Sequence, residues 1–248
     1  MRHKFICCDV FTRMACEMTA RSPHVIDLEF VPMLAHDHPN TLRQELQQRI
    51  DRAVSAKHYD KLILGYGLCG NTTVGLHCSI PMILPRMHDC CTMFMGSKEN
   101  YLREFGGHLS MRWSTNGYYE RCYALPDSAD YLSSGAGYKT SLEYLQLMEK
   151  YDEEDAQYIW DTLHPPMESK EAAYIEMPGY EANDTLNQYR EQIEGNGCSL
   201  KVLQGDITFF EKLVNGPWAS EIFLEVLPGE EVVPVYDMEQ VISAKGNG

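Results

Sequence analysis

Short apolar runs alternate with amphipathic segments along most of this chain, and this alternation is the feature that most constrains its fold. Apolar runs at residues 3–8, 24–31, 61–65 and 79–86 have the length of strands, whereas residues 41–55 carry apolar side chains at every fourth position. Strands that alternate with helices form parallel sheets covered by helices. The sequence therefore predicts an α/β fold with mostly parallel sheets flanked by helices.

The clearest helix is expected after residue 40, with Asn40 or Thr41 as its N-cap. Its apolar stripe consists of Leu42, Leu46, Ile50 and Val54. A short helical segment is expected between Gly70 and the strand at 79–86, and another helix follows Ser97.

The second part of the chain repeats the same alternation after a turn-rich stretch at residues 126–139. Strands are expected at 172–177, 199–204 and 222–227. Two helices are expected within 140–164, with the acidic run DEED at their junction, and one each at 183–194 and 206–214. We therefore expect two Rossmann-like halves, an N-terminal one over residues 1–125 and a C-terminal one over residues 126–248.

The charge balance restricts the partners of the protein. The 248 residues include 36 Asp and Glu but only 21 Lys and Arg, which gives a formal charge of −15. Such an excess repels a phosphate backbone and an anionic membrane surface, so neither nucleic acid nor membrane is expected as a partner. The sequence shows no apolar stretch long enough to span a bilayer and no secretory signal. A cytoplasmic protein with a small-molecule substrate is expected, with a homo-oligomer left open.

Cysteine is the residue type whose placement matters most. The nine cysteines are odd in number and crowd into the first part of the chain, which argues against a secreted disulfide framework. Cys8, Cys69 and Cys90 each fall just beyond the end of an expected strand. Because parallel strands end at one edge of a sheet, the three thiols are expected to converge there.

Three converging thiolates favour a metal site with one open coordination position. Such a set suits a four-iron, four-sulfur (4Fe-4S) cluster or zinc with an exchangeable ligand. Thiol chemistry without metal and buried structural cysteines remain alternatives, and Cys91 is an alternative ligand to Cys90.

Several polar residues surround these cysteines in the sequence. His88 and Asp89 are expected to orient a ligand or transfer a proton, and Arg86 to orient an anionic substrate. A salt bridge is the alternative role for Arg86. Ser97 begins a helix whose N-terminus suits an anion.

The loop that contains Cys69 also matches a dinucleotide-binding pattern. Gly65, Gly67 and Gly70 have the spacing G-x-G-x-x-G, with Tyr66 inside the motif and Asn71 directly after it. Nucleotide binding is therefore a further hypothesis, and glycines of a tight turn are the alternative.

Two segments, YDKLILGYGLCGNTTVGL and IPMILPRMHDCCTMFMGSKENYLREF, resemble the domain of unknown function 1638 family of anaerobic bacteria and methanogenic archaea. The similarity continues in EKYDEEDAQYIWDTL and LQGDITFFEKLVNGPW, so it covers most of the chain. Tyr118 stands where the family pattern has a tryptophan. The resemblance maps the family's cysteines onto Cys8, Cys69 and Cys90, and it adds three further matches at Gly96, Ser97 and Tyr101.

The resemblance implies a neighbour of corrinoid-dependent methyltransferase systems but no established reaction. The leading hypothesis is a metal- or iron–sulfur-binding protein of anaerobic one-carbon or sulfur metabolism, a candidate iron–sulfur- or zinc-dependent transferase or lyase. The alternative is a non-catalytic accessory protein that handles a metal or corrinoid, with a corrinoid protein or methyltransferase as partner. The chain lacks the Asp-x-His-x-x-Gly motif of the usual corrinoid carriers.

Overall fold

The computed structural model describes residues 1–33, 39–106, 111–122, 147–148, 150–163, 170–235 and 240–246. The chain forms two compact units, one of Met1–Arg103 with Gly205–Gly248 and one of Glu104–Gln204. The boundary expected between residues 125 and 126 lies outside the described residues, and the two units divide the chain at other positions. The α/β fold with mostly parallel sheets is confirmed, whereas a division into two sequential halves is not, because the first unit contains both ends of the chain.

The first unit is built around a five-stranded sheet with the strand order β2-β1-β3-β4-β8. Its strands are β1 (Arg2–Cys8), β2 (Val25–Val31), β3 (Lys61–Gly65), β4 (Met82–Pro85) and β8 (Phe223–Val226). The first four strands are parallel, and β8 is antiparallel to β4. This is the 2-1-3-4-5 order of doubly wound sheets with a reversed last strand.

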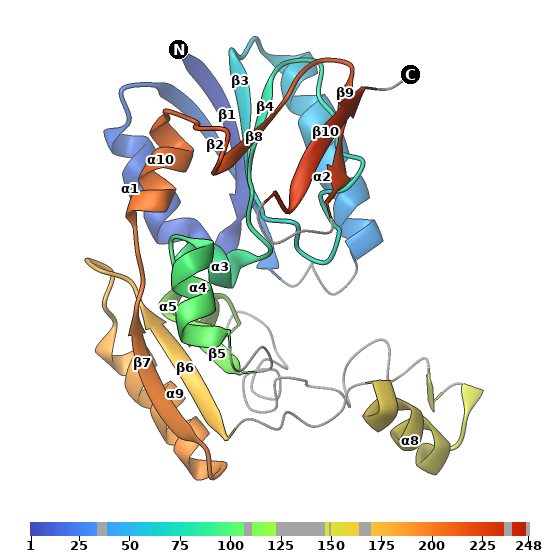
Figure 1. Ribbon diagram of the computed structural model, residues 1–248, viewed down its shortest axis with the longest axis vertical. Helices are drawn as coiled ribbons and strands as arrows, with labels where there is room; N and C mark the ends of the chain where they lie inside the picture. Colours follow the sequence, from blue (N-terminus) through green and yellow to red (C-terminus); the bar gives the residue numbers. More distant parts are fainter. Residues whose placement is uncertain are drawn as a thin grey trace. The chain divides into compact units, whose positions relative to one another are not determined.

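Helices cover both faces of this sheet (Figure 1). A 3-10 turn (η1, Asp9–Phe11) leads into α1 (Thr12–Arg21), which shares one face with α10 (Thr208–Asn215). The rings of Phe5, Phe11 and Phe210 form the contacts there, with centroids 4.9 Å apart for Phe11 and Phe210.

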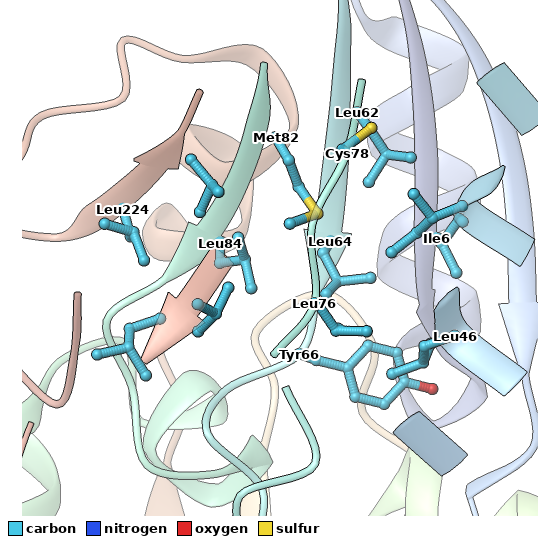
Figure 2. Close-up of a cluster of buried hydrophobic side chains, with 14 of the residues drawn as sticks. Ile6, Leu46, Leu62, Leu64, Tyr66, Leu76, Cys78, Met82, Leu84 and Leu224 are labelled. Carbon is cyan, nitrogen blue, oxygen red and sulfur yellow. The ribbon is translucent and has the colours of Figure 1, made fainter. Parts of the chain in front are cut away.

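The opposite face carries an apolar cluster, which Figure 2 shows. Helix α2 (Pro39–Ala56) packs on it, and so does the antiparallel hairpin of β9 (Glu230–Pro234) and β10 (Ile242–Gly246). The α2 side chains Leu42, Leu46 and Ile50 are buried there, as their spacing predicts. The expected N-cap is wrong, because the helix already begins at Pro39 and therefore includes residues 40 and 41.

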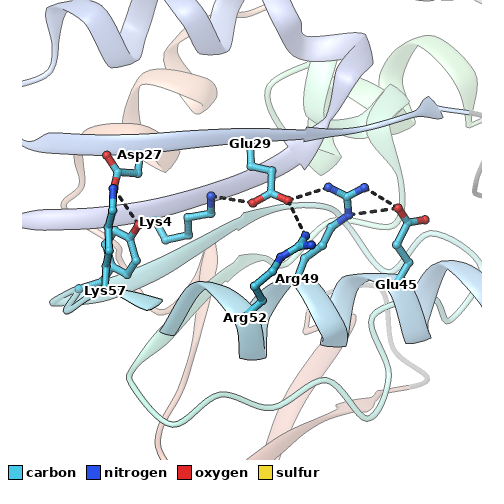
Figure 3. Close-up of polar contacts among 8 residues, drawn as sticks. Lys4, Asp27, Glu29, Glu45, Arg49, Arg52 and Lys57 are labelled. Carbon is cyan, nitrogen blue, oxygen red and sulfur yellow. Dashed lines mark hydrogen bonds and ion pairs between the residues drawn. The ribbon is translucent and has the colours of Figure 1, made fainter. Parts of the chain in front are cut away.

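A charge network ties α2 to β2, the strand at the edge of the sheet (Figure 3). Glu29 accepts ion pairs from Lys4 at 2.7 Å and from Arg49 at 2.6 Å. Burial alone would raise the pKa of Glu29, but these two cations outweigh it and hold the pKa below its usual value. The carboxylate therefore stays charged and paired at neutral pH.

The second unit contains a smaller parallel sheet of β5 (Arg112–Thr115), β6 (Glu171–Glu176) and β7 (Ser199–Gln204). Its described helices are α5 (Asn116–Cys122), α8 (Glu153–Leu163) and α9 (Asn183–Gly195). Tyr174 of β6 packs against Tyr189 of α9 in a small core. Among the described helices of the whole chain, none is long and apolar enough to cross a membrane.

Candidate site at the carboxyl edge of the large sheet

The carboxyl ends of β1, β3 and β4 bring together three of the segments singled out in the sequence. Cys8 is the last residue of β1, the glycine-rich loop follows β3, and the loop with His88 follows β4. The strand order reverses direction between β1 and β3, since β2 lies on one side of β1 and β3 on the other. Ligands of open α/β sheets bind at such a switch point.

The loops after β3 and β4 are joined by backbone hydrogen bonds. Leu68 N donates to Met87 O and Cys69 N donates to His88 O, both at 2.8 Å. Gly67 allows this approach, because a Cβ there would lie 2.6 Å from Met87 O. Gly65 likewise leaves no room for a side chain beside Cys7 of β1. These two glycines of the motif therefore have packing roles.

The glycine-rich loop continues into a left-handed turn. Cys69, Gly70 and Asn71 all have positive φ angles, of 45°, 62° and 68°. Arg43 of α2 holds the turn through its guanidinium, which donates to Asn71 O at 2.7 Å. The helix expected after Gly70 is wrong, because turns follow instead. The motif thus lacks the helix N-terminus that binds pyrophosphate in dinucleotide-binding proteins.

The positive φ of Cys69 predicts an unusual order of stability among its variants. A non-glycine residue in the left-handed region is strained, so we expect Cys69→Gly to be more stable than Cys69→Ala by roughly 1 kcal/mol. Urea unfolding of the two variants measures the difference. A Gly variant that is the less stable of the two would show that the turn does not adopt this conformation.

Cys8 and Cys69 lie close together, although they are far apart in the sequence. Burial is the main reason that the pKa of each thiol is raised to about 12, and for Cys69 the nearby Asp89 and Cys8 contribute to this rise. Both side chains pack against the same apolar cluster as Tyr66. The two thiols are therefore protonated and neutral in this structure at neutral pH.

Asp89 links the thiol pair to the segment that follows β4. Its side chain caps α3 (Cys90–Phe94), where Oδ1 accepts from Thr92 N at 2.8 Å and from Thr92 Oγ1 at 2.9 Å. Burial first, and then the charge of Asp89, raises the pKa of Tyr101 to about 12. Asp89 therefore has a structural role at the start of α3 in addition to any chemical one.

Cys90 is the first residue of α3 and is half-buried, whereas Cys91 beside it is fully buried. No group of three or more His, Cys, Asp or Glu side chains that could hold a metal ion is found among the residues that the structure describes. The convergence of Cys8 with Cys69 is thus present in the structure, and the completion of a ligand set by Cys90 or Cys91 stays a prediction.

Arg86 has structural partners in the first unit. Its Nε donates to Ser220 O at 2.8 Å, and its Nη1 donates to the carbonyl oxygens of Gln240 and Ile242. These bonds fasten the segment around β10 to the end of β4. The expected role of Arg86 in orienting an anion stays a prediction, as does the salt bridge proposed as its alternative.

The segment after α3 contains the remaining expected site residues. Ser97 Oγ accepts from Asn100 N at 3.1 Å and so begins α4 (Lys98–Phe105), as the sequence predicts. Gly96 has a φ of 78° and lies against the side chain of Asp206, where a Cβ would collide. Both residues are thereby explained by local structure. Arg43 and Thr72 also belong to the segments at this edge of the sheet but were not predicted, because single polar residues outside a motif carry no sequence signal.

This arrangement defines the chain as an α/β protein with a doubly wound sheet and a thiol-containing site at the switch point. Residues 30–214 match the family described as protein of unknown function (DUF1638), so the chain belongs to that family. Comparison with curated proteins and with solved structures gave no significant match.

Proposed function

We propose that the protein binds a metal ion or an iron–sulfur cluster through Cys8, Cys69 and Cys90 at the carboxyl edge of the large sheet. Its role would be a step of anaerobic one-carbon or sulfur metabolism. The observation that carries the proposal is the meeting of Cys8 and Cys69 at the switch point, since two thiols from separate strands form the core of a ligand set.

The surroundings of the pair support this assignment. Cys69 is held in a left-handed turn that a cysteine does not adopt without cost, and strain of this kind collects at functional sites. The third ligand has to come from Cys90 or Cys91 at the start of α3, a helix of five residues. The proposal therefore requires a local movement of this short segment toward the pair.

A metal with three protein ligands would supply an open position for a substrate and act as a Lewis acid or, in a cluster, as an electron carrier. Other residues of the chain would hold the ligand-bearing loops in position. His88 follows the strand beside the pair, and its carbonyl oxygen fixes the backbone of Cys69. Asp89 lies next to the Cys69 thiol and keeps the start of α3 in place.

Metal content is the property that tests the proposal. The protein is purified without oxygen, reconstituted either with iron and sulfide or with zinc, and measured for metal and sulfide per chain together with its visible absorption. We expect about four irons and four sulfides, or about one zinc. Cys8→Ser, Cys69→Ser and Cys90→Ser are each expected to reduce the content at least tenfold.

Cys16→Ser is the matched control, because Cys16 is exposed on α1. It should keep the full metal content. Cys91→Ser identifies the third ligand, since loss of metal there with retention in Cys90→Ser would assign the role to Cys91. Metal content that is unchanged in both Cys8→Ser and Cys69→Ser would overturn the proposal, and so would a reconstituted protein that stays empty.

A further inference from the structure

The hydroxyl of Tyr66 is buried beside the thiol pair and has a sulfur as its partner. Tyr66 is 4% exposed, and its ring belongs to the apolar cluster of the first unit (Figure 2). Among the described residues, no nitrogen or oxygen atom pairs with the hydroxyl. The hydroxyl forms a hydrogen bond with the Cys8 sulfur instead. Burial first, and then Cys8, raise the pKa of Tyr66 well above its usual value, so the hydroxyl keeps its proton and is the donor.

The register of the sheet explains why these two side chains meet. The parallel pairing of β1 with β3 places Cys7 opposite Gly65, so the residues that follow, Cys8 and Tyr66, are neighbours across the two strands. Both side chains pack against the apolar cluster and therefore lie on the same face of the sheet. The contact thus follows from the backbone of the sheet and does not depend on a loop.

The backbone supplies further donors to the same sulfur. The N–H of Val10 donates to Cys8, and that of Asp9 contributes as well. A thiol sulfur is a weak hydrogen-bond acceptor, whereas hydrogen bonds to a charged acceptor are shorter and stronger. Donors that gather on one sulfur are therefore used fully only when that sulfur is a thiolate, which is the form that binds a metal.

We propose that Tyr66 is a positioning residue of the metal site, whose hydroxyl donates to the Cys8 thiolate and thereby raises the reduction potential of a bound cluster or strengthens the binding of zinc. The proposal rests on the proposed function, because Tyr66 acts through a metal-bound Cys8. Hydrogen bonds to ligand sulfurs set the potential of a cluster, and groups that hold a ligand in place contribute to the affinity of a metal site.

The hydrogen bond itself is tested in metal-free protein by a double-mutant cycle of Tyr66→Phe and Cys8→Ala. Urea unfolding gives the unfolding equilibrium constant of the four proteins. Tyr66→Phe is expected to raise this constant about threefold to fivefold when Cys8 is present and not to raise it when residue 8 is alanine. Equal effects of Tyr66→Phe in both backgrounds would show that the two side chains are not bonded, and this result would overturn the proposal.

The consequence for the metal is tested in reconstituted protein. In a protein with a cluster, Tyr66→Phe is expected to lower the reduction potential, because the reduced cluster carries one more negative charge and loses a donor. We expect about a tenfold shift of the reduction equilibrium, which is 59 mV for a one-electron couple. In a protein with zinc, competition with a chelator is expected to show about tenfold weaker affinity. The metal content per chain under saturating conditions stays that of the wild type, because Tyr66 is not a ligand.

Tyr59→Phe is the matched control. Tyr59 is 5% exposed and thus as buried as Tyr66, but its hydroxyl donates to Asp27 at 2.7 Å. This variant is expected to leave the potential and the zinc affinity unchanged. A metal-loaded Tyr66→Phe protein that equals the control in both properties would overturn the proposal and leave the metal site standing. A wild-type protein that stays empty after reconstitution would overturn the proposed function, and this proposal with it.

Discussion

Replacing Gly67 by alanine is expected to destabilise the first unit by roughly 2–3 kcal/mol, because the added Cβ would overlap backbone atoms rather than a side chain that can move. The Cβ would lie 2.6 Å from Met87 O and 3.0 Å from Asp89 N. This overlap can be removed only if the loops after β3 and β4 move apart. The hydrogen bonds of Leu68 and Cys69 to the opposite loop would then lengthen or break.

Urea unfolding followed by circular dichroism measures this loss, and metal content measures its consequence for the proposed site. Because Cys69 N is one of the two bonded groups, we expect Gly67→Ala to reduce metal binding although it removes no ligand. Gly195→Ala is the control, since a Cβ at the end of α9 meets nothing within 4 Å. A Gly67→Ala protein as stable as the control would mean that the two loops are not held together in this way.

Lowering the pH from 6.5 to 4 is expected to remove about 3 kcal/mol of stability through His3 alone. His3 is fully buried in β1, and its ring nitrogens have no hydrogen-bond partner among the residues that the structure describes. Its ring lies 4.9 Å from that of His24 and 5.6 Å from that of Trp218. Burial first, and then the neighbouring His24, lower the pKa of His3 from 6.5 to about 4, although Asp60 opposes this shift.

The sign follows from proton binding in the two states. Between pH 6.5 and 4 the unfolded chain binds a proton at this imidazole and the folded protein does not, so acid favours unfolding. The stability is fully present above pH 6.5 and is lost as the pH falls through that window. His3→Phe keeps an aromatic ring in the contact and cannot be protonated.

The measurement is the difference in unfolding free energy between wild type and His3→Phe at several pH values. Carboxylates with lowered pKa, such as Asp27 and Glu29, also lose stability in acid, but they are common to both proteins and cancel in the difference. We expect the unfolding free energy of the wild type to fall steadily, relative to that of His3→Phe, as the pH is lowered from 6.5 to 4. A difference that stays constant over this range would show that the imidazole is accessible to protons in the folded protein.

Much of the large sheet was predictable because its strands are continuous apolar runs. The run at residues 61–65 forms β3 as expected, and the helix with Leu42, Leu46 and Ile50 on one side packs that side onto the sheet. The strands β5, β9 and β10 were missed because each contains polar or charged residues and none forms a continuous apolar run. The segment after Gly70 was wrongly expected to be helical.

For the candidate site, the sequence established which cysteines follow strand ends, since that depends on local patterns along the chain. It could not establish the order of the strands, and this order decides which strand ends are neighbours. The tertiary structure places β3 beside β1, so that Cys69 lies close to Cys8. It also brings Arg86 to carbonyl oxygens of Ser220 and Ile242, which lie far along the chain. Local periodicity thus determined the elements of this protein, whereas the long-range packing of those elements decided which side chains share a site.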